Sequence, residues 1–270
     1  MNAFILVPLL LGILAGAFVN YAGDVLPLTR RFSQPVCNHC QEALSWKEYL
    51  LYRPCHACGG RRGWRSLLVQ VFYPIAAAYL WLQPLRPITW VGNPPTWLGF
   101  LVAMLILTYL GVVFVIDFEH RIIMHPVSIA GALLAFVAGV YIQQSLGQRS
   151  TQYVLDQPLA TTLIGGAIGF GSMLVFYFLG EVFARYIARR RGQTIDEVAL
   201  GFGDVNLAGI AGLFLGARII PFGLLFAILT GGLASLIVIL VMLVRRRYQA
   251  FTPIPYAPFL ILAILYYLFF

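Results

Sequence analysis

Long apolar runs recur along the whole chain, and they constrain its fold more than any motif does. A helix needs about 20 apolar residues to cross a bilayer, with a range of about 17 to 25. Of the 270 residues, 60% are hydrophobic and only 10% are charged, which excludes a soluble globular domain. We predict an all-α polytopic membrane protein with about eight transmembrane helices, near residues 4–21, 67–82, 97–116, 127–142, 160–179, 205–220, 222–244 and 256–270. The second, fourth, sixth and last runs are short or interrupted, so six or seven crossings are the alternative.

The cations are divided unevenly between the two predicted faces of the membrane. Cytoplasmic loops are enriched in Lys and Arg, and with eight crossings 15 of the 18 cations fall on one side. We therefore predict that both termini face outward. The net charge of +8 then reflects topology and contact with anionic lipid of the bilayer, with no nucleic-acid partner. The three cations on the outer side are Arg86, Arg149 and Arg218.

All four cysteines lie in one polar segment after the first run. They form two CxxC pairs that are separated by fourteen residues, namely Cys37, Cys40, Cys55 and Cys58. Two such pairs can supply four sulfurs to a tetrahedral zinc ion, with no open position for catalysis. A segment of this size is too small for an adequate hydrophobic core, and a metal can supply the missing folding energy. The predicted domains are a first transmembrane helix over 1–21, a cytoplasmic zinc-binding domain over 22–66 and a transmembrane domain over 67–270.

Two alternatives to a four-cysteine zinc site remain. Paired disulfides would need an oxidising compartment, whereas the charge distribution places this loop in the reducing cytoplasm. His39 and His56 lie inside the CxxC pairs, so each is a candidate to replace one thiolate. Structural Zn²⁺ with four cysteine ligands is the prediction.

Two aspartates stand where apolar runs meet basic loops. Asp117 ends one run, and Asp204 closes the tetrapeptide Gly201-Phe202-Gly203-Asp204. Ionisable groups at membrane depth are costly and usually functional, although a carboxylate at a helix end can also be an interfacial anchor. Two neighbouring carboxylates share a proton, so that one activates water while the other polarises a scissile carbonyl. This pattern favours an aspartyl dyad, with Glu119 as a less favoured source of the first carboxylate.

Five motifs follow one another along nearly the whole chain. They are Gly16-Ala17-Phe18-Val19-Asn20 with Leu26-Pro27, the double CxxC, Ile116-Asp117 with His120-Arg121-Ile122-Ile123, Gly201-Phe202-Gly203-Asp204, and Thr252-Pro253-Ile254-Pro255-Tyr256-Ala257-Pro258-Phe259. In this order they resemble the motifs of the bacterial prepilin peptidases, which are polytopic GxGD aspartyl proteases. The resemblance implies that the predicted domain over 67–270 is a transmembrane aspartyl peptidase domain.

The resemblance implies an aspartic endopeptidase with Asp117 and Asp204 as its catalytic pair. Its substrate would be the leader of a type IV prepilin or a type II secretion pseudopilin, cut at the cytoplasmic face of the bacterial inner membrane. We expect Gly201, Phe202 and Gly203 to contact the substrate, because glycines let an extended backbone approach closely.

Many members of this family also methylate the new amino terminus with S-adenosylmethionine, and here the chain departs from the pattern. Gln70 stands where a glutamate is usual, and Val25 stands where an arginine is expected before Leu26-Pro27. Methylation is therefore left open, with a peptidase-only enzyme as the alternative. A third departure is His125, which we interpret as a polar turn residue rather than a group that tunes the dyad.

The rival function from another class is a zinc-stabilised transporter in which Asp117 and Asp204 relay protons or cations. The sequence argues against it mildly, since both acids lie at one face and no series of ionisable groups crosses the apolar runs. A non-catalytic scaffold is the third interpretation, and it leaves the paired acids unexplained.

Overall fold

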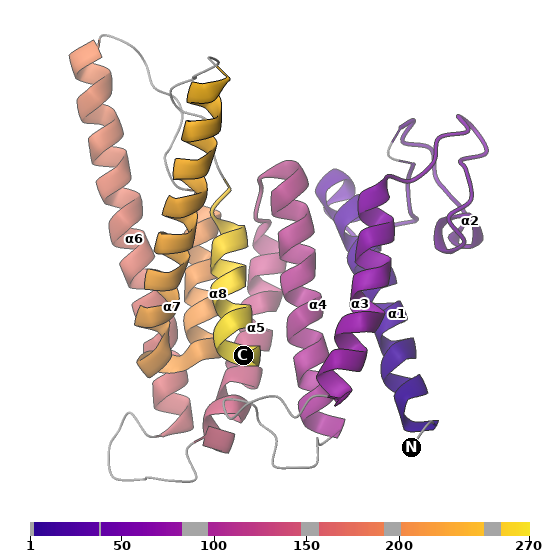
Figure 1. Cartoon of the computed structure of the whole chain (residues 1–270), viewed down its shortest axis with the longest axis horizontal. Coiled ribbons are helices and arrows are strands. Elements are labelled where there is room, and N and C mark those ends of the chain that lie inside the picture. The colour runs from indigo at the N-terminus through magenta and orange to yellow at the C-terminus, as the bar shows by residue number, and fades with distance from the viewer. Residues whose placement is uncertain (1–2, 38, 83–96, 147–156, 192–200, 246–254) are drawn as a thin grey trace. The chain divides into compact units, whose positions relative to one another are not determined.

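Helices make up all the regular structure in the described part of the chain, apart from one isolated β-bridge between Val36 and Ala43. The computed structural model describes residues 3–37, 39–82, 97–146, 157–191, 201–245 and 255–270. The predicted all-α membrane class is confirmed. The helices are α1 (Ala3–Thr29), α2 (Trp46–Leu50), α3 (Trp64–Leu82), α4 (Trp97–His120), α5 (His125–Leu146), α6 (Pro158–Arg191), α7 (Phe202–Val244) and α8 (Ala257–Phe269) (Figure 1).

Six of the described helices are long and apolar enough to cross a membrane, namely α1, α3, α4, α5, α6 and α7. Of these, α7 has 43 residues, a length of about 65 Å at 1.5 Å per residue. This is about twice the 30 Å thickness of a hydrocarbon core. All eight predicted runs are thus helical, with two of them joined in α7 and the last forming the 13-residue α8.

The two arms of α7 meet at Gly216, which is not helical (φ 74°, ψ 169°). The predicted boundary lay near residue 221, so the break comes earlier than expected. Backbone groups freed inside a membrane need partners within the protein. Gln143 Nε2 donates to the Leu215 carbonyl at 3.1 Å, and the Ala217 amide donates to Thr161 Oγ1 at 3.2 Å. Two polar side chains from α5 and α6 therefore satisfy the turn between the arms.

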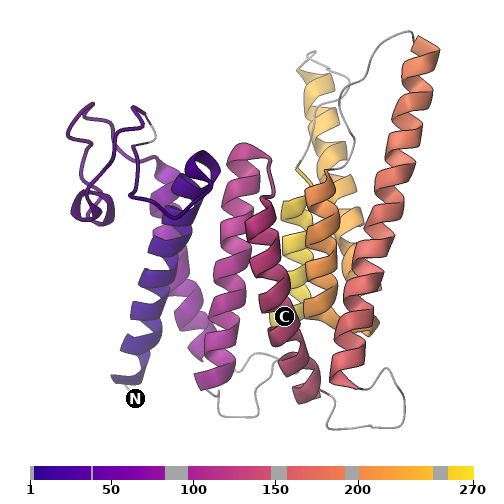
Figure 2. The ribbon, with the colours of Figure 1, turned by 180° about the vertical axis from the view of Figure 1, so that it is seen from behind.

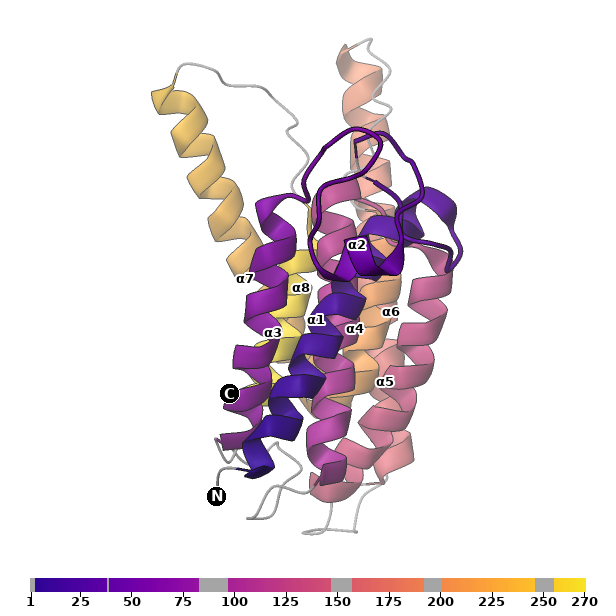
Figure 3. The same ribbon diagram turned by 90° about the vertical axis from the view of Figure 1, so that its right-hand side faces the viewer.

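Two compact units divide the described helices, with α1 to α4 in the first and α5 to α8 in the second. In the first unit α1 packs against both α3 and α4. The loop with α2 lies at the end of α1 remote from the amino terminus (Figure 3). Gly23 of α1 meets α4 so closely that a Cβ added there would lie 2.5 Å from Val115 Cγ1.

The second unit is built around α7, whose first arm lies along α6 (Figure 2). Small residues let the two backbones touch. A Cβ on Gly212 would lie 2.0 Å from the Gly165 carbonyl oxygen, and one on Gly169 would lie 2.2 Å from that of Ala208. Such contacts are typical of membrane helices with glycine at small-xxx-small spacing.

Candidate active site and metal centre

The four cysteine sulfurs form one cluster between α1 and α3. Cys37 and Cys58 Sγ lie 3.6 Å apart, Cys40 and Cys55 Sγ lie 3.7 Å apart, and all four atoms fall within 4.8 Å of one another. The cysteines are free. Four sulfurs placed tetrahedrally at about 2.3 Å from a zinc ion would be about 3.8 Å apart. The cluster therefore has the donors and spacing to hold a metal ion.

Matching turns present the two CxxC pairs. The Cys37 carbonyl accepts from the Gln41 amide at 2.8 Å, and the Cys55 carbonyl accepts from the Gly59 amide at 2.8 Å. Both turns end in the left-handed region, with φ of 59° at Gln41 and 68° at Gly59. Only the second turn has the glycine that favours this region.

The histidines inside the pairs have other contacts. His39 Nε2 lies 3.3 Å from the Arg61 carbonyl oxygen, and His56 Nδ1 lies 3.6 Å from Glu48 Oε2. Glu48 also completes a capping box with Ser45 at the start of α2. The cluster found among the described residues is therefore made of four thiols.

This loop shares a small core with α1, formed by Tyr21, Val25, Cys37, Leu44, Tyr49 and Cys55. Val25, which stands where the resemblance predicts an arginine, is fully buried there. The other departure, Gln70 of α3, donates from Nε2 to the Ile13 carbonyl at 2.9 Å. Gln70 thus binds the backbone of α1, and Val25 belongs to the small core that α1 shares with the loop.

Asp117 lies near the end of α4 and is only 6% exposed. Its neighbours Val115 and Ile116 are buried as well. The helix ends at His120, and Arg121 follows with a left-handed φ of 53°. The first predicted carboxylate is therefore buried within the last turns of a membrane helix.

Asp204 lies in the first turn of α7, where the helix dipole favours a negative charge. Gly201 is the N-cap residue with extended dihedrals, and its carbonyl accepts from the Asp204 amide at 3.0 Å. A Cβ at Gly203 would lie 2.7 Å from Ile123 Cβ, so the close approach at this glycine is made by the segment before α5. Tyr256, just before α8, lies within electrostatic reach of Asp204.

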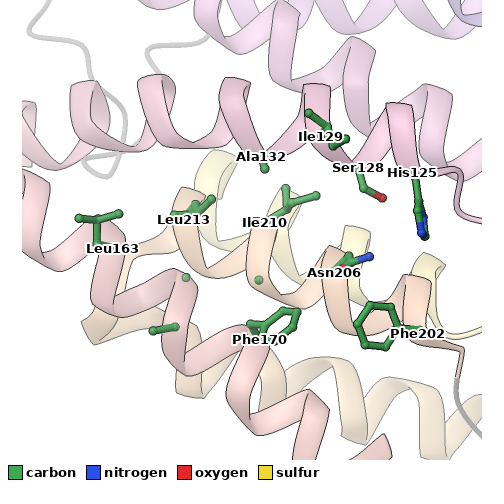
Figure 4. Close-up of a pocket in the computed structure, with 13 residues that line it drawn as sticks. His125, Ser128, Ile129, Ala132, Leu163, Phe170, Phe202, Asn206, Ile210 and Leu213 are labelled. Atoms are coloured by element: carbon green, nitrogen blue, oxygen red, sulfur yellow. The ribbon is translucent and has the colours of Figure 1, made fainter.

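A cavity of about 440 Å³ opens between α5, α6 and the first arm of α7. It is mainly apolar, with His125, Ser128 and Asn206 grouped toward one end (Figure 4). Asp204 is not among its lining residues. At 100° per residue, Asp204 projects from a face of α7 nearly opposite to that of Phe202 and Asn206. His125, the first residue of α5, thus lines a cavity on the other side of α7 from the carboxylate.

Phe202 packs against α6, with its ring centroid 6.3 Å from that of Phe170 and 6.0 Å from that of Tyr177. Its side chain is still 46% exposed. The contact of Gly201, Phe202 and Gly203 with substrate stays a prediction, as does the pairing of Asp117 with Asp204. The aspartates belong to different units.

Sequence reasoning missed Asp24, an aspartate of α1. Its side chain is only 1% exposed. It accepts from Tyr49 Oη at 2.6 Å and pairs with Arg62 and Arg65. An acid close to a long apolar run is the signal that singled out the other two aspartates. The same signal applied to residue 24 would have found it.

Comparisons with known proteins agree on one family. The model of the type IV leader peptidase family matches residues 101–236, just over half of the chain. A "Prepilin leader peptidase/N-methyltransferase" of Myxococcus xanthus is 26% identical over 85% of this chain, which spans 62% of that relative. Proteins with the same name from Stutzerimonas stutzeri and Pseudomonas aeruginosa are 24% and 25% identical over 97% of this chain, and 89% and 88% of their own lengths are covered. No solved structure matches.

Proposed function

Because the chain belongs to the type IV leader peptidase family, we propose that it is a membrane-embedded aspartic endopeptidase. Its substrates are the leader peptides of type IV prepilins or type II secretion pseudopilins. The relatives named prepilin leader peptidases support this substrate class. The enzyme acts in the bacterial inner membrane and cuts at the cytoplasmic face, where the basic loops lie.

The observation that carries the proposal is the position of the two aspartates along the membrane helices. Asp117 lies at the end of α4 and Asp204 at the start of α7. Among the described residues between them, two helices, α5 and α6, are each long and apolar enough to cross a membrane. Two crossings return the chain to the side from which it left, so both carboxylates belong to one face.

A shared proton gives the two carboxylates different roles. Close together they cannot both ionise, so one is the general base that takes a proton from water, and the protonated partner donates to the scissile carbonyl. Glu119 is less suited to the role of first carboxylate, because its Oε1 accepts from Arg65 Nε at 2.8 Å.

We assign the metal centre a structural role with zinc as the ion. Four thiolates close a tetrahedral coordination shell and leave no position for water or substrate. The cluster of Cys37, Cys40, Cys55 and Cys58 suits this ion by its spacing. When bound, the metal supplies folding energy to a loop with a core of only six buried residues shared with α1.

Methyl transfer from S-adenosylmethionine is a separate question, although the names of the relatives include it. Gln70 and Val25 both contribute to packing in this chain. We propose the peptidase activity by itself. Mass spectrometry of the cleaved product with and without the methyl donor measures the second activity directly.

Cleavage of a purified prepilin by reconstituted protein tests the proposal. Wild type should release the leader, and Asp117→Asn and Asp204→Asn should each lower kcat by at least about 10³-fold, since each removes a partner in proton transfer. Glu119→Gln, compared with Asp117→Asn, identifies which acid supplies the first carboxylate. Normal cleavage by either aspartate variant would rule out the dyad, and proton or cation flux through liposomes that depends on both acids would favour a transporter.

A further inference from the structure

Four charged side chains form a continuous series from the cysteine loop to the end of α4, all within the first unit. Asp24 Oδ2 of α1 pairs with Arg62 Nη2 at 3.0 Å, and Asp24 Oδ1 pairs with Arg65 Nη2. Arg65 Nε pairs in turn with Glu119 Oε1 at 2.8 Å. Two negative and two positive groups make the series neutral as a whole.

Its first cation, Arg62, is fixed to the loop. Arg62 lies four residues after Cys58, and its Nη1 and Nη2 donate to the Tyr49 carbonyl at 3.2 Å and the Tyr49 hydroxyl at 2.8 Å. Its guanidinium also lies over the rings of Tyr49 and Tyr52, 3.9 and 4.6 Å from their centroids. A shift of the cysteine loop would therefore move Arg62 and disturb Asp24.

The second cation, Arg65 in the first turn of α3, links three helices. Besides its pairs with Asp24 and Glu119, its Nη1 donates to Asn20 Oδ1 at 3.3 Å. Only a guanidinium has enough donors in a fixed plane to reach all three groups, and a lysine would keep one of them. The side chain of Arg65 is 19% exposed, so these links are shielded from water in part.

Glu119, at the far end of the series, is two residues from Asp117 in the last turn of α4. The same part of α4 is pressed against α1, where Gly23 meets Val115. We propose that Arg65 is a positioning residue: it couples the metal-binding loop to the end of α4 and thereby sets where the Asp117 carboxylate lies. This inference rests on the proposed function and goes beyond it, because it assigns a regulatory link between the metal centre and the reaction.

Glu119→Gln tests the coupling, since it removes the charge and keeps the shape of the side chain. Its matched control is Glu181→Gln, which breaks the Arg185–Glu181 pair on α6, where the acid is 32% exposed against 33% for Glu119. Two quantities are measured on zinc-loaded protein. They are the rate of zinc transfer to a chelating dye, and kcat and KM for a prepilin.

Glu119→Gln should release zinc about two to five times faster than wild type, as expected for loss of a partly exposed ion pair. It should lower kcat about tenfold with KM unchanged, because small displacements of a catalytic group cost rate. Arg65→Lys, which preserves the charge balance, should change both quantities in the same direction. Glu181→Gln should behave as wild type.

Wild-type zinc release and kcat in Glu119→Gln and Arg65→Lys would overturn the proposal. A lower kcat with unchanged zinc release would also overturn it, because Glu119 would then act in the reaction without coupling to the loop. Faster zinc release with unchanged kcat would refute the positioning role. If wild type cleaves no prepilin, the proposed function fails, whereas the zinc-release comparison still decides whether the loop and α4 are coupled.

Discussion

The helices inside each of the two units are held together by different kinds of contact. At the cysteine loop of the first unit four thiols form one cluster, and a partly buried series of charges links α1, α3 and α4. In the second unit α6 and the first arm of α7 meet backbone to backbone through glycines. Where water competes, directional polar groups fix the arrangement, whereas in lipid, which is as apolar as the side chains, close packing must do so. Cysteines and charged side chains therefore fix the helices of the first unit, whereas glycines fix α6 and α7 in the second.

Loss of one thiol should have the largest effect on the loop. Cys37→Ser leaves three thiolates, and because the metal supplies folding energy, we expect the loop to lose both zinc and protection from protease. His39→Ala is the matched control in the same turn, and it should keep one zinc per chain. Metal analysis and limited proteolysis measure both variants. Loss of zinc from His39→Ala would instead make the histidine a ligand.

Asp24→Asn should have the next largest effect, because it leaves Arg62 and Arg65 without their shared buried carboxylate. Removal of one partner from a buried ion pair costs about 3–5 kcal/mol. The intrinsic fluorescence of Trp46 and Trp64 follows denaturant unfolding of this region. Glu42→Gln, an exposed acid in the same loop, should leave the midpoint unchanged. Equal midpoints for both variants would mean that the charges do not hold the first unit.

Gly212→Ala tests the close packing of the second unit. A Cβ there would lie 2.0 Å from the Gly165 carbonyl oxygen, so α6 and α7 must separate, at a cost of about 1–3 kcal/mol. At Gly232 of α7 no atom lies within 4 Å of such a Cβ, and Gly232→Ala should be neutral or stabilise by up to about 1 kcal/mol. Thermal unfolding in detergent compares them. A lower midpoint is expected for Gly212→Ala and an unchanged or higher one for Gly232→Ala. An unchanged midpoint for Gly212→Ala would show that the helices separate freely.

The smallest effect is expected from Gln41→Gly in the first CxxC turn. Gln41 has a φ of 59° where the matching position of the second turn is Gly59. A non-glycine residue in the left-handed region costs about 1–2 kcal/mol, part of which is offset by the entropy of glycine in the unfolded loop. Zinc release to a chelator should therefore slow slightly. Faster release would mean that the Gln41 side chain stabilises the turn.

Most of the helices could be predicted, because the length of an apolar run is a local property of the sequence. The eight predicted runs are all helical, and the CxxC pairs were recognised by spacing because each pair is one tight turn. The break in α7 was placed five residues late. It depends on Gln143 and Thr161, which are remote in the sequence and satisfy the backbone at Gly216.

The sequence by itself determined the class of protein, the four candidate metal ligands and the two candidate catalytic aspartates, since each follows from residue type and spacing. Only the tertiary structure decided what Asp24, Arg62, Arg65 and Glu119 do. Their contacts join positions as far as 54 residues apart, and side chains that carry charge look alike in sequence whether they face water or each other. The free energy of a buried ion pair depends on partners that only folding brings together.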